Sequence, residues 1–191
     1  MTKSKIDMLN ESIRRRRYKE ALRHILEIDD LNVVDSHGYL PLTRAVSMKS
    51  TNRMNVSKII KVLVWRGANI DATDPVGETA LFCAVKNNRF ENMITLIRLG
   101  SSMDKQNYEG QTPMMIAASM GKLKTVKALV ANGANAEVAD TTGKIAWNYA
   151  SNAVYCQYFL FKHSLSYLLE KRANSDLIRE LGLVVNKATS S

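Results

Sequence analysis

The chain has 191 residues, of which 46% are hydrophobic and 24% charged, so it can form one globular domain or one short array of small units. Its 27 Lys and Arg outnumber its 18 Asp and Glu, and the net charge of +9 favours acidic partners. Two cysteines are too few for a disulfide framework or a cysteine-based zinc site. The sequence has neither an apolar run of membrane-spanning length nor a secretory signal, so we expect a cytoplasmic protein to which the nucleus is also open.

The chain opens with a predicted pair of helices, residues 1–34, that caps the units after it. Ser4 and Asp7 have the spacing of a capping box at the start of the first helix. That helix carries Ile6, Leu9 and Ile13 on one side, and a second helix is predicted over residues 18–28. The turn between them holds the most basic run of the chain, which is Arg14, Arg15, Arg16 and Arg17, followed by Lys19.

A short block then recurs, beginning at positions 35, 74, 107 and 140. Each copy has Asp or Asn three residues before Gly, a pattern that predicts a tight turn. Thr79 and Thr112 stand where a helix N-cap belongs, and a short helix with small alanines follows. A second helix with an i, i+3, i+4 apolar stripe comes next, ended by a glycine in the C-cap position. These glycines are Gly67, Gly100 and Gly133, and the predicted units are residues 35–73, 74–106 and 107–139.

The first of these units is longer than the other two. The copies start 39, 33 and 33 residues apart, so six extra residues fall in the first unit. We assign them to residues 49–54, a stretch without apolar periodicity, which predicts a loop before a helix that begins near Val56. Such a loop is either a neutral change in length or a dedicated contact loop.

The fourth copy is degenerate and predicts a C-terminal cap over residues 140–182. Residues 154–169 are rich in large apolar side chains, but interspersed polar residues favour a long packed capping helix over a membrane span. One more short helix is expected over residues 175–181, ended by Gly182. Residues 183–191 are expected to form a flexible tail.

These motifs resemble those of the ankyrin repeat family, whose unit of 33 residues is a β-turn followed by two antiparallel helices. Residues 66–71 (Arg-Gly-Ala-Asn-Ile-Asp) and 132–135 (Asn-Gly-Ala-Asn) are similar to the family's junction between repeats, and Pro113 to its Thr-Pro helix start. The resemblance implies an all-α solenoid of helix pairs with β-turn fingers and helical caps. Leu40 stands where the family usually has threonine. The histidine that the family usually has after the leucine of the helix start is also replaced, so we expect a looser or different side-chain network between neighbouring repeats. The residues that replace it are Thr43, Cys83, Met115 and Asn148.

The sequence contains no recognisable catalytic or metal-binding motif. None of the three histidines has a His or Cys at i+3 or i+4, so no helix face carries paired metal ligands. Cys83 and Cys156 lie in apolar helical segments, a setting typical of buried small side chains rather than nucleophiles. The adjacent Asp29 and Asp30 are interpreted as a solvated turn. We therefore expect a protein that is not an enzyme and uses neither a cofactor nor a metal.

The resemblance implies that a protein partner binds the concave side of the array, where turn tips and inner helices are exposed. Tyr39, Met48, Tyr108 and Met120 are the expected anchors, because interface centres favour Tyr and Met. Simple exposure beside a neighbouring tip is the alternative for each. The other residues expected to contact the partner are Ser36, His37, Val76, Glu78, Lys86, Asn87, Glu109, Gln111, Thr142 and Lys144.

Two further functions stay open. The run Arg14–Arg17 with Lys19, together with the basic first repeat, is a candidate surface for nucleic acid or another polyanion, or a nuclear-import signal. Nearby carboxylates lower the net charge of residues 1–34 to +2, which favours a solvated turn instead. In the third reading, the array is a structural subunit of a larger assembly whose partner packs on the apolar C-terminal helix. No membrane partner is expected.

Overall fold

The computed structural model describes residues 4–48, 53–150 and 154–171, which form ten helices. They are α1 (Lys5–Arg14), α2 (Tyr18–Glu27), α3 (Pro41–Ser47), α4 (Arg53–Trp65), α5 (Ala80–Lys86), α6 (Phe90–Arg98), α7 (Pro113–Ser119), α8 (Leu123–Ala131), α9 (Ala146–Tyr149) and α10 (Val154–Lys171). None of these helices combines the length and the hydropathy that crossing a membrane requires.

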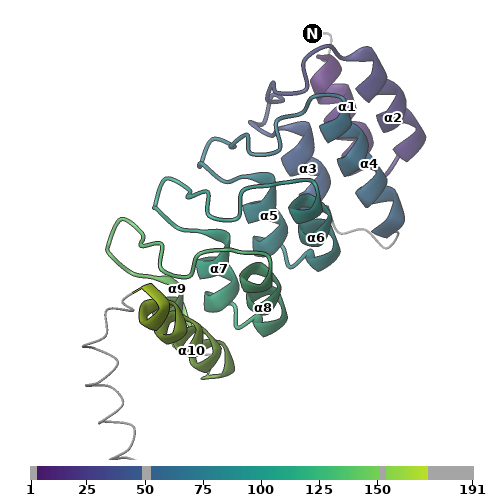
Figure 1. Ribbon diagram of the computed structural model, residues 1–191. Coiled ribbons are helices and arrows are strands. Elements are labelled where there is room, and N and C mark those ends of the chain that lie inside the picture. Colours follow the sequence, from purple (N-terminus) through teal and green to yellow (C-terminus); the bar gives the residue numbers. More distant parts are fainter. Residues whose placement is uncertain (1–3, 49–52, 151–153, 172–191) are drawn as a thin grey trace, which may run out of the picture.

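The helices lie in two layers that run along the array (Figure 1). The inner helices α1, α3, α5, α7 and α9 pack one against the next, and each is covered by the outer helix that follows it in the chain. Four loops project in a row from one side of the array and join each outer helix to the next inner helix. We call these segments, residues 28–40, 66–79, 99–112 and 132–145, the fingers. This arrangement confirms the predicted all-α solenoid.

The helix caps lie where the sequence pattern predicts them. The Ser4 hydroxyl accepts a hydrogen bond from the Asp7 N–H at 3.0 Å, which is half of a complete capping box. Thr79 and Thr112 cap α5 and α7 in the same way, whereas Leu40 gives α3 no side-chain cap. The predicted C-cap glycines all have positive φ, which are +93° at Gly67, +89° at Gly100 and +94° at Gly133.

Apolar side chains of both layers meet in one continuous core. Small residues lie where inner helices touch: Ala45, Ala84 and Ala117 are at most 1% exposed, and they let neighbouring helices approach closely. Met93, Met114 and Leu129 are fully buried in this core. Cys83 and Cys156 are buried as well, as predicted.

Neighbouring fingers interlock at their tips. Each tip has a glycine with positive φ, and a Cβ atom there would lie 2.8 Å from the Tyr108 ring at Gly77 and 2.6 Å from the Thr141 nitrogen at Gly110. The Thr141 N–H and hydroxyl both donate to the Glu109 carbonyl, at 3.3 and 2.9 Å. The Tyr108 N–H donates to the Val76 carbonyl at 3.5 Å. The row of fingers is therefore a packed surface rather than a set of independent loops.

The residues that replace the usual histidine bond within their own repeats. The Thr43 hydroxyl donates to the Leu40 carbonyl at 2.9 Å, and Asn148 Oδ1 accepts from the Ile145 N–H at 2.9 Å. Met115 Sδ accepts from the Thr112 N–H at 3.4 Å. These bonds lie within single repeats and hold the starts of these three inner helices.

The structure corrects one boundary of the array. α4 begins at Arg53, so the loop of the first repeat is shorter than the predicted 49–54, and residues 49–52 lie outside the described part. The predicted capping helix is present as α10. The short helix expected over residues 175–181 and the tail expected over residues 183–191 also lie outside the described residues.

Candidate partner-binding surface

The finger tips present large apolar side chains to solvent. Tyr39 is 41% exposed, Val76 55% and Tyr108 73%, and Met120 at the end of α7 is 40% exposed. Met48 is half-buried and packs against the core. Ser36, His37, Glu109, Thr142 and Lys144 are exposed on the fingers, as are Lys86 and Asn87 at the end of α5, while Gln111 is half-buried.

The first finger is held by a buried carboxylate. Asp35 Oδ1 accepts the backbone N–H groups of His37 and Tyr39, both at 2.9 Å, and Oδ2 accepts Asn10 Nδ2 at 2.8 Å and the Arg44 guanidinium at 3.3 Å. Burial alone would raise the pKa of Asp35, but these hydrogen bonds outweigh it and hold the pKa below its ordinary value. The Arg44 guanidinium also lies 3.8 Å from the centre of the Tyr39 ring. These contacts therefore fix the position of Tyr39 at the tip of the first finger.

The second finger corrects one expectation. Glu78 is 7% exposed, not an open tip, because its side chain folds onto α5. Lys86 Nζ donates to Glu78 Oε1 at 2.6 Å, so two residues expected to contact a partner are paired with each other. The Cys83 thiol lies beside this pair, where burial and the Glu78 charge raise the pKa of the thiol to about 12. Val76 remains the exposed apolar residue of this tip.

The third and fourth fingers are joined through side chains as well as backbone. Asn107 Oδ1 accepts the N–H groups of Glu109 and Gln111, at 3.0 and 2.8 Å. Gln111 Nε2 in turn donates to the Tyr149 hydroxyl at 3.3 Å, and that hydroxyl donates to Asp140. The hydrogen bond from Tyr149 is the main reason that the pKa of Asp140 lies well below its ordinary value.

Two groups of potential metal ligands come together although their spacing shows no metal motif. They are Asp7, Asp35 and His37 in one group and Asp74, Glu78 and Cys83 in the other. Asp35 and Glu78 are each bonded to a cationic side chain, and the Cys83 thiol has a raised pKa. A metal ion needs these ligands deprotonated and unengaged, so neither group is arranged to hold one.

The basic run Arg14–Arg17 forms the turn between α1 and α2, as predicted. Arg14 and Arg15 both pair with Glu11, and Arg17 pairs with Glu20 at 3.3 Å. The hydrogen bond from Arg14 lowers the pKa of Glu11 to about 2. Arg16 is exposed on the same turn, and Lys19 is exposed at the start of α2.

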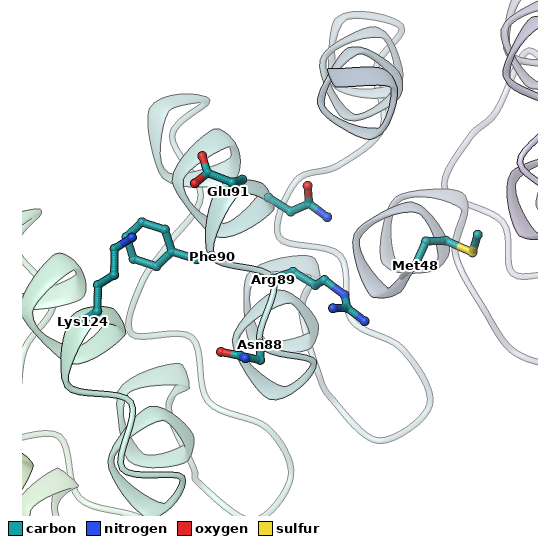
Figure 2. A pocket seen from close by; sticks show the side chains of 7 residues that line it. Met48, Asn88, Arg89, Phe90, Glu91 and Lys124 are labelled. Atoms are coloured by element: carbon teal, nitrogen blue, oxygen red, sulfur yellow. The ribbon is translucent and has the colours of Figure 1, made fainter. Parts of the chain in front are cut away.

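A separate pocket lies at the start of α6, where the turn from α5 meets the end of α3 (Figure 2). Its lining includes Met48, Arg89 and Phe90, and the ammonium group of Lys124 lies 4.0 Å from the centre of the Phe90 ring. Figure 2 shows the Arg89 side chain extending toward Met48. Met48 therefore lies at the edge of this pocket, with its side chain turned away from Arg89, a position that the repeat pattern alone does not reveal.

Sequence reasoning missed exposed aromatic residues outside the fingers. Trp65 is 79% exposed at the end of α4, and Tyr158 and Phe161 are 67% and 53% exposed on α10. The signal for α10 is present in the sequence, because Val154, Tyr158 and Phe161 follow i, i+4, i+7 spacing while Cys156 and Leu160 make the buried side.

Comparisons with known proteins agree with this geometry. A family model described as ankyrin repeats (3 copies) matches residues 48–140 and 95–178. The chain is 28% identical over 174 residues to Protein glp-1 of Caenorhabditis elegans, covering 83% of this chain and 13% of that protein. It is 32% identical over 134 residues to glycerophosphocholine phosphodiesterase gde1 of Schizosaccharomyces pombe, covering 70% and 11%. It is 34% identical over 108 residues to the B-cell lymphoma 3 protein homolog of Mus musculus, covering 56% and 22%. The chain thus spans less than a quarter of each of these relatives.

Proposed function

We propose, from the premise that this chain belongs to the ankyrin repeat family, that it is a non-enzymatic adaptor or scaffold whose finger face binds a protein partner. Ankyrin repeats generally mediate protein–protein interaction, and the repeat itself is non-catalytic. The relative named as a phosphodiesterase is matched over 11% of its length, so its name carries no activity to this chain. The cytoplasm, with the nucleus open, is the proposed compartment.

One observation carries the proposal: aromatic and apolar tips are exposed on a row of interlocked fingers. Tyr108 is 73% exposed, yet its backbone N–H donates to the second finger and its ring lies against Gly77. A preformed surface loses little conformational entropy when it binds, and exposed tyrosines supply contact area with few rotatable bonds. These are properties of a recognition surface.

The test compares alanine variants in partner capture followed by quantitative mass spectrometry. The double variant Tyr39→Ala, Tyr108→Ala should lose the captured partner about tenfold or more, because each removes a central aromatic contact. Tyr158→Ala is the matched control, since it removes a tyrosine of similar exposure from α10. Equal loss in the control, or no loss in the double variant when both fold normally, would contradict the proposal.

A second candidate function is polyanion binding by the turn that holds Arg14–Arg17. The observation that favours it is the exposure of these arginines and of Lys19 on one edge of the N-terminal cap. The pairs with Glu11 and Glu20 weaken it. If the turn contacts six phosphates of the polyanion, the logarithm of the binding constant should fall with the logarithm of the salt concentration with a slope of roughly five. An interface anchored by tyrosine and methionine should respond weakly to salt.

A third candidate is a structural subunit of a larger assembly. The exposed apolar side of α10 favours it, because a solenoid end normally needs a polar outer face. Replacing Tyr158 and Phe161 by glutamine should then abolish assembly while leaving capture by the finger face intact.

A further inference from the structure

The charge of the molecule is divided between its two sides. The four fingers together carry ten Asp and Glu but three Lys and Arg, a net charge of −7. Since the whole chain has a net charge of +9, all other residues together carry +16. The net charge therefore conceals an acidic side and a strongly basic remainder.

The outer layer carries part of this basic remainder, because α2, α4, α6 and α8 together have a net charge of +5. Figure 1 shows the fingers projecting from one side of the array and α2, α4, α6 and α8 forming the outer layer. Exposed cationic side chains on these helices are Lys19, Arg23, Lys58, Lys61, Arg98, Lys124 and Lys127. An acidic macromolecule would be attracted to this layer, whereas the fingers would repel it.

The inner helices do little to neutralise the fingers. The inner helix α1 has two basic and two acidic residues, and the charged residues of α3, α5, α7 and α9 are Arg44 and Lys86 alone. Each is already paired with a finger carboxylate, Arg44 with Asp35 and Lys86 with Glu78. The concave surface made by these helices and the fingers therefore keeps a net charge of −5.

One exposed finger carboxylate lies beside an exposed aromatic tip. Glu109 is exposed and adjoins Tyr108, and the backbone bond from Thr141 fixes the Glu109 carbonyl in the row. A tyrosine ring in such a field attracts a cation, and the first finger already shows this contact, with the Arg44 guanidinium 3.8 Å from the Tyr39 ring centre. Tyr108 offers a similar ring, 73% exposed.

We propose that the finger face binds a segment of its protein partner rich in arginine and lysine, not the acidic segment that the overall charge suggests. This inference rests on the proposed function and adds the chemistry of the partner. Cationic side chains of the segment would stack on Tyr108 and pair with Glu109, while the field of the remaining finger carboxylates steers the approach.

The test measures the binding of fluorescein-labelled peptides by anisotropy at low and physiological salt. One peptide alternates arginine with glycine, and its control alternates glutamate with glycine. We expect the arginine peptide to bind about tenfold tighter than the glutamate peptide, with the difference shrinking as salt screens the charges. Tighter binding of the glutamate peptide, or no binding of the arginine peptide, would overturn the proposal.

Charge reversal locates the site. Glu109→Lys should weaken binding of the arginine peptide by about three- to tenfold, whereas Glu91→Lys, the same change at an exposed position of α6, should leave its affinity within about twofold. Equal effects of the two reversals would overturn the assignment to the fingers. If Tyr108→Ala loses the captured natural partner but Glu109→Lys does not, the finger face binds the partner and the proposed charge preference is wrong. If neither variant loses that partner, the proposed function itself fails.

Discussion

Interlocking of the fingers predicts that two equivalent glycines differ in their tolerance of alanine. Gly110 and Gly143 occupy the same position of the third and fourth fingers, with φ of +76° and +80°. Alanine at either position costs about 1–2 kcal/mol of unfolding free energy, because a Cβ atom disfavours positive φ. At Gly143 nothing lies within 4 Å of the added Cβ, so that is the whole expected loss.

Gly110 has the next finger against it. Its Cβ would lie 2.6 Å from the Thr141 nitrogen and 3.0 Å from backbone atoms of Asp140, so the fourth finger would have to move. Overpacking of this kind lowers the unfolding free energy by about 1–3 kcal/mol. The movement would also lengthen the two hydrogen bonds from Thr141 to the Glu109 carbonyl. We expect a total loss of about 3–5 kcal/mol for Gly110→Ala.

Urea unfolding followed by circular dichroism measures both variants against the unchanged protein, with the slope of each transition fitted separately. Gly143→Ala is the matched control because it carries the same backbone strain without the contact. Equal losses for the two variants would refute the interlocking of the fingers.

Three further predictions test the packing and the electrostatics. Ala117→Leu should lower the unfolding free energy by about 1–3 kcal/mol through overpacking of α7, while Ala131→Leu at the exposed end of α8 should change it by less than about 0.5 kcal/mol in urea unfolding. The Cys83 thiol, with its pKa raised to about 12, should not react with a disulfide reagent at about pH 8 until the protein is unfolded, as absorbance would report. The ionised Asp140, whose pKa is lowered by Tyr149, should add stability that is present above about pH 4 and lost as the pH falls further, so melting temperatures of Asp140→Asn should fall less between about pH 4 and pH 2; an unchanged pH profile would contradict this role.

Local rules predict most of the fold. Thr79, Thr112 and Gly133 act through their nearest backbone neighbours, so their positions in the sequence are enough to place the ends of the helices. The early start of α4 at Arg53 is not predictable in this way, because the first turn of that helix lacks the apolar stripe.

The surface was harder to predict because it depends on side chains that are distant in the sequence. Glu78 has the turn-tip position of an exposed residue, but Lys86 on the next helix draws it inward. The net charge was also misleading, since it adds an acidic row of fingers to a basic remainder of the chain. Only the assignment of each charged residue to a finger or a helix separates the two.

Site-specific photo-crosslinking tests most directly whether the finger face is the recognition surface. A photoreactive phenylalanine analogue replaces Tyr108 in one variant of the chain and Tyr158 in a second variant. Each variant is irradiated in a cell extract. We predict a discrete covalent adduct with a partner protein from position 108 and none from position 158. An adduct from position 158 alone would contradict the account and assign recognition to α10.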